Sequence, residues 1–251
     1  MQKSLILLVL FLVAGCASVP KTTPESMSRL QYGMPSSQVH EALNHQGALL
    51  FRGKRGGNHY FGIYYEVENT FRKYCLIFED DRLAAVTPLE KFMESWTASA
   101  GDQLPYEHGF DALHQALVPN VIKLDQVNFS DVDMAARAES KRATLAGINE
   151  ALAWSWIAIP LSPVLIPFLI VDSNRLERFN DAWAKLPLDL PRELVIARLG
   201  NPSVARTNLN SDYEVMIFEA SGSLWDKAAI GLRHGKIEWM NRNGYSIYKK
   251  L

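Results

Sequence analysis

Hydrophobic and polar residues follow the same succession of patterns twice along this chain. Each succession starts with a proline and then places apolar residues four positions apart, which predicts a short helix with proline in its first turn. The two segments read GMPSSQVHEALNHQG and DLPRELVIARLGNPS. A shift of 156 positions places Pro35 on Pro191 and Leu43 on Leu199. We therefore interpret the two segments as copies of one helix.

Strands are predicted after each helix, because apolar and polar residues alternate there. The segment YFGIYYEVE corresponds to YEVMIFEAS, and LIFEDDRLAAV corresponds to IGLRHGKIEWM. In the last two segments the pairs Asp80-Asp81 and His234-Gly235 lie between alternating arms, a pattern typical of a β-hairpin. The sequence thus predicts an α+β fold of two repeats, each a helix followed by an antiparallel sheet of about three strands.

The region between the repeats is predicted to be helical. We place the first repeat at residues 29–88, a helical insertion at 89–183 and the second repeat at 184–251. A long helix starts at the candidate N-cap Ser130, and a second helix starts after Ser162. Together the two helices predict a hairpin inserted between the repeats.

The tip of this hairpin, residues 151–171, contains no charged residue. Its length suffices for a transmembrane helix, but its prolines argue against a straight helix, and one crossing would separate the two repeats by the membrane. Three alternatives remain: the tip dips into the membrane, packs between the repeats, or binds a partner protein. The candidate contact residues are Trp154, Trp156, Ile157, Leu161, Ile166, Phe168 and Ile170.

The N-terminus has the pattern of a secretory signal peptide over residues 1–15, with Lys3 before an apolar run. The letters VAGC that end at Cys16 resemble the lipobox of bacterial lipoproteins, which implies lipidation of Cys16. Acyl chains on this residue would anchor the protein to a bilayer. By the same resemblance, the absence of aspartate at the second position of the mature chain, after Cys16, implies sorting to the periplasmic face of the outer membrane. Residues 16–28 are then expected to be a polar tether.

The repeat motifs resemble those of the BamE (SmpA/OmlA) outer-membrane lipoproteins. The second copy carries the resemblance through Leu190, Pro191, Val195, Leu199, Gly200, Pro202, Gly235 and Lys236. The first copy departs from the pattern, since Asn44 replaces the glycine and no proline follows the helix. The resemblance implies a tandem-repeat fold related to the β-lactamase-inhibitor-protein-like fold. It also implies a role in outer-membrane assembly or integrity, with the barrel-assembly machinery as a candidate partner.

Composition and motifs argue against several classes of function. The 26 basic and 27 acidic residues leave no basic excess for nucleic-acid binding. With Cys16 lipidated, Cys75 has no disulfide partner, and its strand-like surroundings predict a buried thiol. His40 and His45 in HEALNH are one residue too far apart for a zinc-protease motif, and we interpret both as surface residues. We therefore expect a non-enzymatic protein without a metal site or cofactor.

The segment FRGKRGGN, residues 51–58, is the candidate for ligand contact. Arg52, Lys54 and Arg55 could hold an anion, a phosphate or a lipid headgroup, although a flexible basic connection would have the same composition. The function we expect is that of a lipid-anchored outer-membrane lipoprotein acting as a protein-interaction or scaffold module in envelope assembly or integrity. The alternative is a periplasmic ligand-binding or inhibitory protein whose paired sheets hold a soluble target or glycan.

Overall fold

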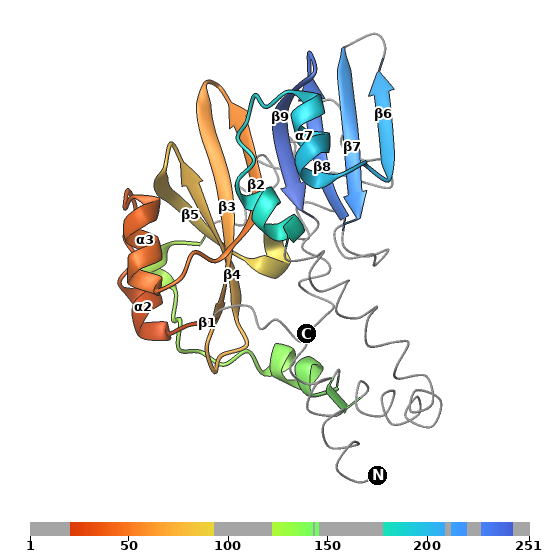
Figure 1. Ribbon diagram of the computed structural model, residues 1–251. Helices are drawn as coiled ribbons and strands as arrows, with labels where there is room; N and C mark the ends of the chain where they lie inside the picture. The colour runs from red at the N-terminus through yellow and green to blue at the C-terminus, as the bar shows by residue number, and fades with distance from the viewer. Residues whose placement is uncertain are drawn as a thin grey trace, which may run out of the picture.

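The computed structural model describes residues 21–92, 122–142, 144–145, 178–208, 212–219 and 227–242. Within this part the chain is a mixed α+β protein built on one large antiparallel sheet, in the order β5-β4-β3-β2-β9-β8-β7-β6 (Figure 1). The strands are β1 (Lys21–Thr22), β2 (Ala48–Arg55), β3 (Asn58–Val67), β4 (Lys73–Glu79), β5 (Arg82–Pro88), β6 (Val204–Asn208), β7 (Tyr213–Glu219), β8 (Lys227–Arg233) and β9 (Lys236–Arg242).

The helices are short and pack beside the strands. The named helices are α2 (Pro24–Ser28), α3 (Ser36–Leu43), the 3-10 turn η2 (Leu124–Gln126) and α7 (Arg192–Leu199). Residues 89–92, 134–142 and 178–184 are also helical. Among the described residues, no helix is both long and apolar enough to cross a membrane.

Two four-stranded meanders meet in the middle of the sheet. The sequence predicted about three strands after each helix, but Ala48–Arg55 and Val204–Asn208 are strands as well. β2 pairs with β9 in antiparallel register, with Arg52 opposite Met240. The two halves therefore share one continuous sheet.

The basic segment FRGKRGGN forms the tight hairpin between β2 and β3, and most of its residues lie in paired strands rather than in a loop. Its first five residues belong to β2, and only Gly56 and Gly57, with φ of 58° and 91°, form the turn into β3. Gly62 of β3 explains the close packing of this hairpin. The ring of Phe51 lies directly over Gly62, where a Cβ atom would be 2.2 Å from the nearest ring atom.

Both predicted hairpins are present, and each turns through two residues with positive φ, as in the tight turns typical of hairpins. Asp80 and Asp81 have φ of 44° and 65°, and His234 and Gly235 have φ of 51° and 71°. These turns connect β4 to β5 and β8 to β9. Asn44 ends α3 with φ of 58°, the left-handed conformation that asparagine tolerates.

The two halves hold their helices by the same backbone hydrogen bonds. The amide of Ser36 donates to the carbonyl of Asp81 at 3.0 Å, and the amide of Arg192 donates to that of Gly235 at 2.9 Å. One step further on, Leu83 and Ile237 each donate to the chain segment that precedes the helix. Each helix is therefore tied to the turn of its own last hairpin.

α3 and α7 cover the same face of the sheet. Leu49 of β2 packs with the core beneath α7, and its direct cross-strand neighbour Ile63 packs with the core beneath α3. The opposite face carries a third core that runs across the junction. Its residues include Phe51 and Tyr64 from the first half and Tyr213 and Trp239 from the second. The shared core makes the halves one packing unit.

The described part of the predicted tether is folded. Lys21 and Thr22 form β1, and the Lys21 ammonium lies 2.8 Å from the carboxylate of Glu66. The hydroxyl of Thr23 caps α2, and Met27 of this helix is fully buried. Residues 21–28 therefore belong to the first half of the sheet, because β3 extends beyond β2 and leaves an edge for β1 to pair with.

Part of the predicted insertion is also described. The helix beginning at residue 134 is capped by Asp133, whose carboxylate accepts from the amide of Ala136 at 2.9 Å. Ser130, the cap we predicted, lies in a turn. The predicted signal peptide, Cys16 and the apolar tip at 151–171 with its candidate contact residues all lie outside the described residues.

Candidate functional site

A cleft of about 710 Å³ lies on the helix face between the two halves of the sheet. We call it the junction cleft. One wall comes from the first half, and the other comes from the segment that precedes α7. Residues important for its chemistry are Ser36, His40, Arg52, His59, Asp80, Asp81 and Asp189. The strand pairing of β2 with β9 brings these walls together, although they are far apart in the sequence.

Arg52 is the arginine that lines the junction cleft. Its guanidinium donates to the backbone carbonyl of Leu186, and burial lowers its pKa. Among the described residues, no carboxylate lies within salt-bridge distance of Arg52. A guanidinium has five N–H donors in a planar fork that matches a carboxylate or phosphate. Arg52 therefore has unused donors for an anionic ligand.

The carboxylates around the cleft already have partners. The carboxylate of Asp81 accepts from the hydroxyl of Ser36, and that of Asp80 accepts from the amide of His59 at 2.8 Å. Asp189 is paired with the ammonium of Lys54. These contacts stabilise the turns and walls of the cleft. Arg52, which also lines the cleft, has no carboxylate partner in the described part of the chain.

The structure separates the three predicted anion contacts. Arg52 lines the junction cleft, whereas Lys54 is occupied by Asp189 and neither Lys54 nor Arg55 lines the cleft. The sequence identified Arg52 from its basic, glycine-rich surroundings. It held no signal for Leu186, which lies 134 positions further along the chain and accepts the hydrogen bond from Arg52.

The two histidines of HEALNH are half-buried rather than on the surface, so that prediction was wrong. The Nδ1 atom of His40 lies 2.9 Å from the hydroxyl of Tyr65, and the ring of His45 lies 5.0 Å from the Tyr65 ring. The Nε2 atom of His45 is buried without a hydrogen-bond partner among the described residues. Burial lowers the pKa of both histidines, and in His45 the neighbouring His40 lowers it further.

These pKa shifts predict a loss of stability in mild acid. An unfolded histidine titrates near about 6.5, so below that pH the unfolded chain binds more protons than the folded one. The free energy of unfolding should therefore be highest above that pH and should fall as the pH is lowered below it. Urea unfolding at a series of pH values measures this dependence of the free energy of unfolding on pH. His45→Gln should flatten this slope, whereas His59→Gln, at an exposed histidine, should not. Equal slopes in both variants would contradict the prediction.

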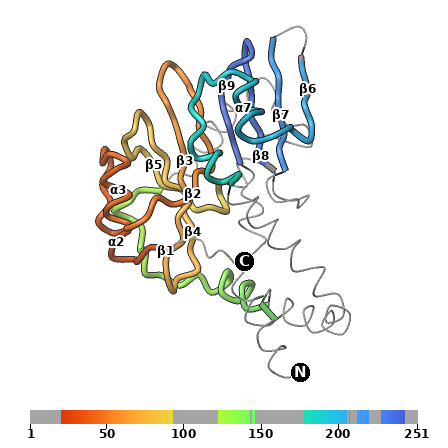
Figure 2. The backbone as a smooth tube through the Cα atoms, in the orientation of Figure 1, coloured from red at the N-terminus to blue at the C-terminus, as the bar shows by residue number. Residues whose placement is uncertain are grey.

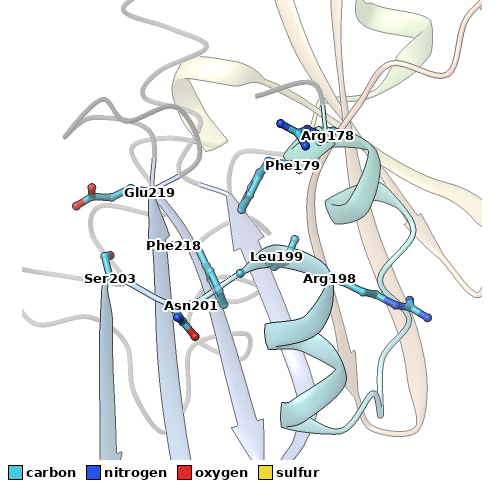
Figure 3. Close-up of a pocket in the computed structure, with 9 residues that line it drawn as sticks. Arg178, Phe179, Arg198, Leu199, Asn201, Ser203, Phe218 and Glu219 are labelled. Atoms are coloured by element: carbon cyan, nitrogen blue, oxygen red, sulfur yellow. The ribbon is translucent and has the colours of Figure 1, made fainter. Parts of the chain in front are cut away.

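A second cavity, of about 440 Å³, lies at the C-terminal end of α7 (Figure 3). Phe179 and Phe218 form its apolar side, with ring centroids 6.5 Å apart. Both rings belong to the core beneath α7. The side chain of Arg198 points away from the two rings (Figure 3). Phe179 and Phe218 thus serve the core beneath α7 as well as lining this cavity.

Two features of the described part of the chain bear on catalysis, the arrangement of potential metal ligands and the thiol of Cys75. No group of three histidine, cysteine or carboxylate side chains among them could hold a metal ion. Cys75 is fully buried as predicted, and burial raises the pKa of its thiol, which keeps it protonated and unreactive. The arrangement is suited to binding an anionic group at Arg52.

Fold and cleft together define the class of this protein: an α+β protein with one large antiparallel sheet and a cleft, lined by Arg52, at the junction of its halves. Comparisons of the chain with protein-family models, with curated proteins and with solved structures give no match. The assignment of a function therefore depends on the residues of this chain.

Proposed function

We propose that this protein is a lipid-anchored outer-membrane lipoprotein that acts as a non-enzymatic protein-interaction module in the cell envelope. The signal-peptide pattern and the VAGC motif at Cys16 support export and lipidation. The junction cleft supports binding, because its guanidinium, that of Arg52, has no carboxylate partner among the described residues.

We also propose that the two halves are BamE-like tandem repeats with an apolar helical hairpin inserted between them. The matching hydrogen bonds at Ser36 and Arg192, and the matching hairpins, support a common origin of the halves. The resemblance of the repeat motifs to BamE lipoproteins implies a role in outer-membrane assembly or integrity, with the barrel-assembly machinery as a candidate partner. The apolar tip at 151–171 is a further candidate contact with membrane or partner.

The environment of Arg52 is the observation on which the binding function depends. Keeping a guanidinium half-buried beside a carbonyl costs free energy unless an anion also binds it. A carboxylate on the partner, from an acidic side chain or a chain terminus, would form the bidentate pair that a guanidinium prefers. The same cleft also favours the second candidate function, in which a soluble ligand or target bearing a carboxylate occupies it.

Site-specific photocrosslinking in cells tests the proposal. A photoreactive amino acid at Gln46, an exposed residue of the junction cleft, should give one discrete adduct with an envelope protein. Arg52→Gln should reduce this adduct about tenfold or more, since breaking a buried charge pair costs 2–5 kcal/mol of binding energy. Arg29→Gln, which removes a charge from an exposed position, should leave the adduct unchanged.

Two further experiments test the lipidation of Cys16 and the role of the cleft separately. The mass of the mature N-terminal peptide should show a diacylglyceryl group on Cys16, and Cys16→Ser should release the protein from membranes. An adduct that survives Arg52→Gln would refute the role of the cleft. Binding of a small carboxylate ligand at the cleft without any protein adduct would favour the second candidate function.

A further inference from the structure

Three segments meet at one end of the sheet, which we call the anchor end. They are β1, the β3–β4 turn at residues 68–72, and the start of the helix at residue 134 (Figure 2). The amide of Asp133 donates to the carbonyl of Thr70 at 2.8 Å, and Arg72 donates to the carbonyl of Asp131 at 3.0 Å. These hydrogen bonds hold the beginning of the helix against the turn.

The anchor end also contains Lys21, the first residue that the structure describes. Only residues 17–20 separate Cys16 from β1. A residue spans at most about 3.6 Å, so these few residues reach roughly 15–20 Å from the lipidated cysteine. If Cys16 carries lipid, as the proposed function requires, the anchor end must lie close to the bilayer surface.

The helix at the anchor end presents apolar and basic residues to solvent. Met134 is 66 % exposed and Leu145 is 53 % exposed, and Val132 just before the helix is 41 % exposed. Arg137 and Lys141 are exposed as well, and neither lies within salt-bridge distance of a carboxylate among the described residues.

These residues share one side of the helix. Positions 134, 137, 141 and 145 follow the spacing of three and four residues that places side chains above one another. A helical face that combines apolar and basic side chains is typical of helices that lie in the surface of a membrane. Anionic headgroups attract lysine and arginine near the surface. In the sequence, the uncharged segment at 151–171 begins shortly after Leu145.

We propose that the anchor end is a membrane-binding surface, with the face of Met134, Arg137, Lys141 and Leu145 lying on anionic phospholipid. This proposal rests on the proposed lipidation for its position but adds a contact made by the folded protein itself. It also orients the molecule. Along β3 the junction cleft is lined from His59 to Ile63, which lie three to seven residues, or roughly 10–23 Å, from Glu66. The cleft would therefore lie farther from the bilayer than the anchor end does.

Vesicle binding of the mature chain with Cys16→Ser tests this surface without the lipid. Vesicles of phosphatidylethanolamine with phosphatidylglycerol should bind this protein, and pure phosphatidylcholine vesicles should bind it less. Arg137→Glu with Lys141→Glu should weaken binding at least about tenfold, since each basic residue near an anionic surface contributes roughly fivefold. Lys185→Glu with Lys236→Glu, the same change at two exposed lysines elsewhere, should change binding less than about twofold.

Fluorescent labelling locates the contact. Because Cys75 is fully buried, a single introduced cysteine can be labelled selectively. An environment-sensitive dye at Met134→Cys should shift to the blue on adding vesicles, and a dye at Lys236→Cys should not. Equal binding of both charge-reversed proteins, or a shift only at position 236, would overturn the proposal. The mass of the Cys16 peptide decides lipidation separately, so failure of one proposal is distinguishable from failure of the other.

Discussion

Replacing Trp239 by alanine is expected to lower the free energy of unfolding by about 3–5 kcal/mol, the range for removing a buried tryptophan. Trp239 is 3 % exposed and lies over Gly231, where a Cβ atom would be 2.2 Å from its indole nitrogen. The indole N–H donates to the hydroxyl of Tyr213. Since Trp239 also lies opposite Gly53 of β2, the substitution removes packing from the junction of the two halves.

Chemical unfolding followed by circular dichroism and by tryptophan fluorescence measures this effect. The two signals should change together in the wild-type protein, because the core on that face spans both halves. Leu194→Ala, at a side chain on α7 that is about half exposed, is the control and should cost clearly less than Trp239→Ala. A loss below about 1.5 kcal/mol for Trp239→Ala would show that the junction does not depend on this residue.

Asn241→Leu is expected to raise the free energy of unfolding by about 1–3 kcal/mol. Asn241 is 2 % exposed, and neither its amide nitrogen nor its carbonyl oxygen has a hydrogen-bond partner among the described residues. It lies opposite Phe51 of β2 and Ala229 of β8. Burying an unpaired amide costs free energy, and leucine has the same branching without polar atoms.

Asn180 provides a control, because its replacement by leucine should change the free energy of unfolding in the opposite direction. The side-chain carbonyl of Asn180 accepts a hydrogen bond from the guanidinium of the nearly buried Arg242. Asn180→Leu should therefore lower the free energy of unfolding by about 1–3 kcal/mol. Urea titrations of both variants test the pair. If Asn241→Leu destabilises the protein as much as Asn180→Leu does, the amide of Asn241 has a partner in solution.

The sequence by itself determined the local features of this fold. Proline at the helix starts and the two-residue turns at Asp80-Asp81 and His234-Gly235 predicted α3, α7 and both hairpins. These features depend on neighbouring residues, because turn conformation and helix starts are set within a few positions. Apolar alternation likewise predicted the buried thiol of Cys75. The α+β class followed from the same local patterns.

Only the tertiary structure decided how the halves combine. β2 carries charges and Gly53 within its alternation, and a register shift between Leu49 and Phe51 interrupts its period, so its sequence resembles a loop. Its partner β9 is nearly two hundred positions away, and pairing over such distances depends on which edges and faces remain to be buried. The junction cleft exists only because that pairing brings Arg52 beside Leu186. Local patterns therefore determined the parts, and long-range packing determined the site.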